Sequence, residues 1–85
     1  MDHEKVVVVR DNVSPLAAKI VKTYFVDRCN DSERPNAMFD GATGRYDEAA
    51  RTMTVEAGLT SATPPEVGRV AVERAFQFAE DMLAD

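Results

Sequence analysis

The stretch TMTVEA, residues 52–57, alternates strictly between polar and apolar side chains. A period of two residues is typical of a β-strand that has one face against a core and one face in water. Residues 45–46 can belong to a preceding strand, and residues 47–50 separate them from this stretch. That spacing fits a hairpin with a loop of four or five residues. Residues 37–57 therefore predict a β-hairpin or meander. Residues 37–39 can add a further strand that turns at Asp40-Gly41 or at Thr43-Gly44.

A second clear strand signal is the run of four valines at residues 6–9. β-Branched side chains pack well on a pleated sheet, so we expect a strand over about residues 5–10. An unbroken apolar run is typical of a strand that is buried on both sides. The sequence thus predicts that both faces of this strand are covered.

A first helix is predicted over about residues 15–29. Ser14 can cap it through its hydroxyl, and Pro15 suits the first turn, where no amide donor is needed. Val26 falls among polar residues on a regular helical wheel, so we expect its side chain to be exposed. The apolar face of that wheel comprises Leu16, Ala17, Ile20, Val21, Tyr24 and Phe25.

A second helix is predicted over about residues 64–83, because Thr63 and Glu66 have the spacing of a capping box and Pro64 suits the first helical position. Small residues occupy the middle of its broad apolar arc: Gly68, Ala71, Ala75 and Ala79.

Two features of this arc predict how the second helix packs. Glycine costs about 1 kcal/mol relative to alanine inside a helix, so we expect Gly68 to mark a close approach to a neighbouring element. Phe76 and Phe78 point apart on the wheel, so a single flat contact cannot bury both of them.

The element order β-α-(β)-β-β-α predicts one α+β domain that spans residues 1–85. We expect a small two-layer sandwich, in which an antiparallel sheet of three to four strands carries two helices on one face. Two helices cover only one face of a sheet, whereas the strand at residues 5–10 is apolar on both faces. The arc of the second helix is also wider than one contact needs. Apolar surface on the strand or on the second helix that the chain itself does not cover suggests a homodimer interface.

The net charge of −5 comes entirely from the second half of the chain, because residues 46–85 contain eight acidic and three basic side chains. An acidic surface repels phosphate backbones and anionic membranes. We therefore expect neither nucleic-acid binding nor a membrane partner. The expected partner is another protein, and a basic surface on it would complement the acidic one. No apolar run reaches the length of a signal-peptide core or a membrane span, so a cytoplasmic location is expected.

Catalytic residue patterns are missing from the sequence. His3 is the only histidine and Cys29 the only cysteine, so neither a nucleophile–base pair nor a transition-metal site can be assembled. We therefore expect no enzymatic activity, no cofactor and no metal. Cys29 is expected to be a small, half-buried hydrophobic residue.

The leading hypothesis is a noncatalytic protein-interaction module, such as an adaptor, an inhibitor or a small regulatory subunit. It would act through an acidic and apolar surface on the second helix, whose candidate residues are Glu73, Phe76, Glu80, Asp81 and Leu83. The alternative is a small-molecule or anion-binding domain, in which backbone amides of a glycine-rich loop cradle the ligand. Its candidate residues are Asp40, Gly41, Thr43, Gly44 and Arg45.

Overall fold

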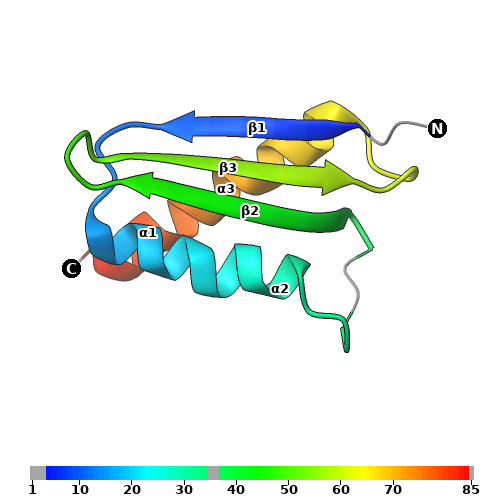
Figure 1. Cartoon of the computed structure of the whole chain (residues 1–85), viewed down its shortest axis with the longest axis horizontal. Helices are drawn as coiled ribbons and strands as arrows, with labels where there is room; N and C mark the ends of the chain where they lie inside the picture. The colour runs from blue at the N-terminus through cyan, green and yellow to red at the C-terminus, as the bar shows by residue number, and fades with distance from the viewer. Residues whose placement is uncertain (1–3, 35–36, 85) are drawn as a thin grey trace.

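The computed structural model describes residues 4–34 and 37–84 and confirms the α+β class. Three antiparallel strands lie in the order β1-β3-β2, and the helices pack against one face of this sheet (Figure 1). His3 lies outside the described residues. The elements are β1 (Lys5–Arg10), α1 (Pro15–Val21), η1 (Lys22–Val26), α2 (Asp27–Cys29), β2 (Phe39–Asp47), β3 (Thr52–Leu59) and α3 (Pro65–Leu83).

The alternating stretch forms the central strand, β3, and the predicted two-sided pattern is confirmed. Its buried side chains face the helices, whereas the polar residues between them are partly exposed. β3 runs two residues farther than the alternation suggested, because Gly58 pairs with Lys5 and Leu59 with Phe39. The buried residues of β3 are Met53, Val55, Ala57 and Leu59.

The hairpin between β2 and β3 has a four-residue loop, residues 48–51, as expected. The expected turn at Asp40-Gly41 or Thr43-Gly44 is absent from the described residues, since residues 39–47 form one continuous strand. A register shift lies between Phe39 and Ala42, and Gly41 adopts a φ of 83° there. Gly41 thus lies in a β-bulge, where glycine permits a positive φ. Because the chain continues through the bulge without turning back, the sheet has three strands rather than four.

β1 does not have two covered faces within one chain. Val6 and Val8 are buried against the helices, whereas Val7 is 41% exposed and Val9 is 61% exposed. The expectation that both faces are covered was wrong for the isolated chain, because α1, η1, α2 and α3 all lie on the same side of the sheet (Figure 1).

The first helix spans the predicted residues, but its middle is a π-helix, η1. The Asp27 amide donates to the Lys22 carbonyl, five residues back. The wide turn adds one residue to the helical repeat and rotates everything after it. Val26 is therefore buried rather than exposed, and Tyr24 is exposed although the regular wheel placed it on the apolar face. Leu16, which the wheel also placed on that face, is exposed for a different reason: it precedes the wide turn, and the buried face of α1 consists of Ala17, Ala18 and Val21.

The predicted capping box at the start of the second helix does not form. Pro64 is the N-cap residue, in extended conformation, and α3 begins at Pro65. A residue before proline is disfavoured in the helical region, so Pro64 cannot take the first helical position. The hydroxyl of Thr63 lies 3.0 Å from that of Thr60 instead, which ties the turn before α3 together.

Close packing at Gly68 is confirmed. A Cβ atom at this position would overlap the Leu59 side chain, so the missing side chain lets α3 lie directly on β3. The divergence of the two phenylalanines is confirmed as well, since Phe76 is 2% exposed and Phe78 is 48% exposed.

Candidate functional site

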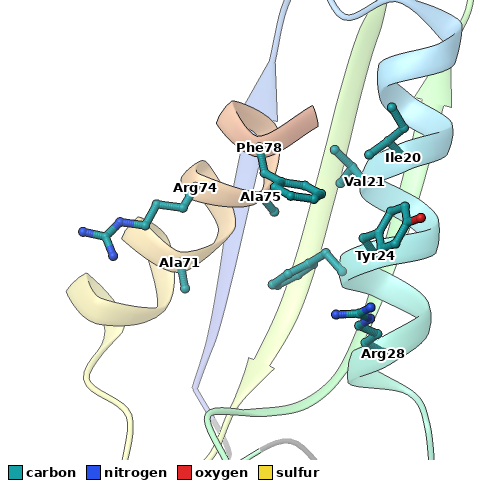
Figure 2. Close-up of a pocket in the computed structure, with 9 residues that line it drawn as sticks. Ile20, Val21, Tyr24, Arg28, Ala71, Arg74, Ala75 and Phe78 are labelled. Atoms are coloured by element: carbon teal, nitrogen blue, oxygen red, sulfur yellow. The ribbon is translucent and has the colours of Figure 1, made fainter. Parts of the chain in front are cut away.

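The outer surface of the helical layer carries an apolar groove of about 380 Å³ between the first helix and α3 (Figure 2). α3 runs diagonally across the sheet, so it packs on α1 at one end and stands apart from α2 at the other (Figure 1). The helices therefore enclose a wedge rather than a closed seam. Its walls comprise Ile20, Val21, Tyr24, Phe25, Arg28, Ala71, Arg74, Ala75 and Phe78.

Two aromatic side chains from opposite walls meet in this groove. The rings of Tyr24 and Phe78 lie 5.9 Å apart in an edge-to-face arrangement. Such a pair adds about 0.5–1.5 kcal/mol beyond the burial of its area. Tyr24 nevertheless remains 43% exposed and Phe78 nearly half exposed, so both rings present apolar surface to solvent.

The π-helical turn explains how the first wall is built. Because η1 rotates the helix, Val26 enters the core and Tyr24 moves to the rim, while Phe25 packs edge-to-face on Phe39 at 5.2 Å. Regular wheel geometry places Tyr24 inside, so sequence reasoning missed this exposed aromatic residue. π-Bulges are frequent at functional sites, which makes the rim formed by η1 a feature of interest.

The second wall depends on the small residues that the sequence marked on α3. Gly68 and Ala79 are buried, whereas Ala71 and Ala75 are partly exposed and line the groove. Short side chains at these two positions leave room that a larger residue would fill. The small-residue arc thus serves close packing on the sheet and hollows the surface beside it.

Both charged residues of the groove are arginines. The Arg28 guanidinium lies over the Tyr24 ring at 5.3 Å from its centroid, on one wall, and Arg74 comes from the other. Cation–π contacts of this kind contribute about 0.5–1 kcal/mol at exposed sites. Neither arginine forms an ion pair with the acidic side chains of the described residues. Arg28 therefore puts a positive charge at the groove of a chain that is acidic overall, whereas the Arg74 side chain extends away from Tyr24 and Phe78 (Figure 2).

A second hollow of about 540 Å³ continues the groove toward the start of α3. It shares Ala71 and Arg74 with the first hollow, and Val67 and Val70 expose apolar surface along it. Met38, which precedes β2, and the acidic Glu66 also line it. Apolar surface thus extends along the whole wedge between the helices.

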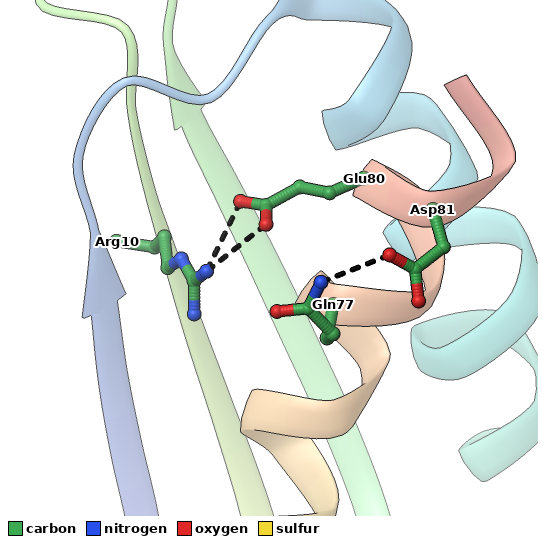
Figure 3. Close-up of polar contacts among 4 residues, drawn as sticks. All are labelled: Arg10, Gln77, Glu80 and Asp81. Atoms are coloured by element: carbon green, nitrogen blue, oxygen red, sulfur yellow. Dashed lines mark hydrogen bonds and ion pairs between the residues drawn. The ribbon is translucent and has the colours of Figure 1, made fainter. Parts of the chain in front are cut away.

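The predicted acidic and apolar surface on α3 is only partly assembled. Phe76 is not on the surface, because it is buried beneath the Arg10 guanidinium, which lies 5.8 Å from its ring centroid. The same guanidinium donates to both carboxylate oxygens of Glu80 at 3.0 and 3.2 Å, as Figure 3 shows. Glu80 is therefore engaged within the chain, and a hollow of about 230 Å³ brings it together with Phe76 and Leu83.

The other two predicted surface residues lie apart from that hollow. Asp81 accepts a hydrogen bond of 2.9 Å from the side-chain Nε2 of Gln77, on a different side of α3 from Glu80 (Figure 3). Glu73 is exposed. Consecutive carboxylates on a helix diverge by about 100°, so the five predicted residues do not form one continuous patch.

The predicted anion loop is not a loop. Residues 40–45 belong to β2, where Thr43 pairs with Glu56 and Arg45 with Thr54 across the sheet. The Ala42 amide and carbonyl are both taken by the side chain of Asn30. Ala42 therefore has no free backbone amide to offer an anion. The assumption of a loop was wrong, because the two glycines serve a bulge and a close approach rather than turns.

The remaining reactive group is the thiol of Cys29, which is buried. Burial raises the pKa of the Cys29 thiol from 9.0 to about 11, so the thiol stays protonated at neutral pH. Among residues 4–34 and 37–84, no group of three or more His, Cys, Asp or Glu side chains lies close enough to hold a metal ion. Within the same ranges, no helix is both long and apolar enough to cross a lipid bilayer.

Comparisons with protein-family models, with curated proteins and with solved structures return no match.

Proposed function

We propose that this protein is a noncatalytic interaction module, and that it binds an amphipathic helix of a partner protein in the groove between α3 and the first helix. One observation carries the proposal: Tyr24 and Phe78 stay about half exposed in a hollow lined by apolar side chains. Aromatic residues and arginine are enriched where proteins bind each other, and the groove has both.

The shape of the groove favours a helix as the occupant. Two helices diverge on one face of a sheet and leave an apolar wedge between them. A third helix can lay an apolar stripe into such a wedge with side chains spaced at i, i+3, i+4 and i+7. Ala71 and Ala75 lower one wall, which allows close approach of a partner backbone.

The charges of the groove favour acidic side chains on the flank of that helix. Arg28 and Arg74 stand on opposite walls and have no acidic partner among the described residues. Carboxylates on the bound helix would pair with them and strengthen binding at low salt. A partner with a basic surface, expected from the net charge, would instead dock on exposed acids such as Glu73, away from the groove.

The proposed role is that of an adaptor, an inhibitor or a small regulatory subunit. Such a module needs one docking surface and no reactive group, which agrees with a buried, protonated thiol at Cys29. A lone unpaired cysteine suits a reducing compartment, so the proposal places the module in the cytoplasm.

Selection of binders from a display library of short amphipathic helical peptides tests this proposal. We expect the enriched peptides to carry Asp or Glu beside their apolar face. Fluorescence anisotropy should show that Phe78→Ala and Arg74→Glu each weaken binding by about tenfold or more. Affinity should also fall as salt rises, because the arginines are solvent-exposed.

Arg45→Glu is the matched control, since it reverses the same charge on β2, away from the groove. It should leave peptide binding unchanged. Failure to select any helical peptide, or binding that survives Phe78→Ala, would overturn the groove as the docking surface. Selection of basic peptides whose binding requires Glu73 would move the docking surface to the acids of α3.

A further inference from the structure

The two edges of the sheet are treated differently by the rest of the chain. β2 forms one edge, and there the bulge at Gly41 and the side chain of Asn30 interrupt and cover the strand. β1 forms the other edge, and within residues 4–34 and 37–84 it pairs with β3 alone. Proteins protect exposed edges with bulges, prolines, inward charges or covering segments. The centre of β1 carries neither a proline nor a charge, since residues 6–9 are all valine, and its register with β3 has no bulge.

The register shows which backbone groups of β1 remain available. The Leu59 amide donates to the Glu4 carbonyl at 2.8 Å, and this pair is in register with Val6 and Ala57. Bonded and non-bonded pairs alternate along an antiparallel ladder, so even-numbered residues of β1 bond to β3. The amides and carbonyls of Val7 and Val9 therefore point away from the sheet, toward the open edge.

The side chains of those residues add apolar surface at the same place. Val7 and Val9 are the exposed valines of the face that no helix covers. An edge with free backbone groups and exposed β-branched side chains is a template for another strand. Lys5 on this face is held by the carboxylate of Glu56 at 2.6 Å, which reduces the repulsion that its charge offers to an incoming strand.

We propose that β1 pairs with β1 of a second copy of this chain, antiparallel about a two-fold axis at Val7, to give a dimer with a continuous six-stranded sheet. This register places Val6 opposite Val8, Lys5 opposite Val9 and Val7 opposite its own copy. It also places Glu4 opposite Arg10, whose guanidinium already pairs with Glu80, and it keeps the two Lys5 side chains apart. The interface is self-complementary, as a two-fold contact requires.

The proposed dimer leaves the groove between the helices open. The groove lies on the outer surface of the helical layer, whereas the new strand pair forms at the free margin of β1 (Figures 1 and 2). The dimer proposal and the helix-binding proposal therefore involve different surfaces, and either can be wrong without affecting the other. Each dimer would present two grooves, which raises avidity for a partner that carries two binding helices.

Sedimentation equilibrium across micromolar concentrations tests the dimer. We expect the wild type to dimerise, and Val7→Lys to raise the dimer Kd at least tenfold, because two lysines would face each other at the axis. Thr43→Lys is the matched control: it adds the same charge to an exposed position of β2, the other edge strand, and should leave the Kd unchanged. A wild type that is monomeric at high micromolar concentration would overturn the proposal.

Cysteine cross-linking tests the register separately. In the proposed dimer, Val7→Cys brings two thiols to the axis, where the spacing of paired strands permits a disulfide. Val9→Cys places its two thiols about 14 Å apart along the strand, which is too far. Under oxidised glutathione, Val7→Cys should form a covalent dimer and Val9→Cys should not. Equal cross-linking of both variants, or none of Val7→Cys, would rule out this register.

Discussion

The side chain of Asn30 makes the two hydrogen bonds with Ala42 that a neighbouring β-strand would make. Its Nδ2 donates to the Ala42 carbonyl and its Oδ1 accepts from the Ala42 amide, both at 2.8 Å. Asn30 is the residue that ends α2, so one side chain joins the end of the first helix to the edge of β2. The contact satisfies backbone groups beside the bulge and closes this edge to other strands.

Replacement of Asn30 should destabilise the fold. Asn30→Ala removes both hydrogen bonds, and Asn30→Asp keeps the acceptor but aims a carboxylate at the Ala42 carbonyl. We expect each change to lower the free energy of unfolding by about 1–3 kcal/mol. Urea denaturation measures this, with Glu33→Ala in the adjacent exposed turn as a control that stays within about 0.5 kcal/mol of wild type. A near-neutral Asn30→Ala would show that water replaces the side chain at no cost.

Gly68→Ala distinguishes helix propensity from packing by the sign of its effect. Propensity alone predicts a gain of about 1 kcal/mol in the interior of α3. The new Cβ would overlap the buried Leu59 side chain, and overpacking of this kind costs about 1–3 kcal/mol, so we expect net destabilisation.

A double-mutant cycle assigns that cost to the contact with Leu59. In a Leu59→Ala background the overlap disappears, and Gly68→Ala should then be neutral or stabilising. An equal loss of stability in both backgrounds would mean that the strain arises elsewhere.

The π-helical turn makes Val26 a core residue, which substitution can test. Val26→Ala removes a buried side chain and should cost about 1–3 kcal/mol of unfolding free energy. Leu16→Ala removes an exposed side chain before the wide turn and is the control, with an expected cost of less than about 0.5 kcal/mol. A regular helix that buries Ala17, Ala18 and Val21 would turn Val26 toward solvent, so Val26→Ala would then cost as little as the control. Thermal and urea denaturation of the two variants therefore report whether the wide turn at Lys22–Val26 exists in solution.

Ionisation of Cys29 should weaken the fold at high pH. The pKa of its thiol is raised from 9.0 to about 11 by burial. Because the folded-state pKa is the higher one, the contribution of the neutral thiol is fully present below about pH 9 and is lost as pH rises toward 11. We expect the wild type to lose stability over this window relative to Cys29→Ala. Urea denaturation of both proteins at several pH values measures the difference, which should stay constant if the thiol is accessible to water.

Local patterns predicted much of the fold because each depends on a single element. The alternation in residues 52–57 indicates which side chains of one strand face the core, whatever that core contains. The divergence of Phe76 and Phe78 follows from helical geometry alone. The candidate site was harder to predict, since its walls come from two helices far apart in the chain. The negative net charge predicted a basic partner, whereas the groove is lined by two arginines. Net charge is a sum over the whole surface and does not show the charge of one site.

The sequence by itself determined which segments form helices and strands and in what order. It also contains no residue pattern that is typical of a catalytic site. The tertiary structure decided which side chains of each helix face the core and how the edges of the sheet are covered. The bulge at Gly41 and the cover over Ala42 depend on residues distant along the chain, and the wide turn that exposes Tyr24 departs from the regular helical repeat. The Tyr46 hydroxyl, which donates to the Val13 carbonyl at 2.6 Å, is another such contact. Local periodicity is blind to these contacts, because their free energy arises only when the separate elements pack together.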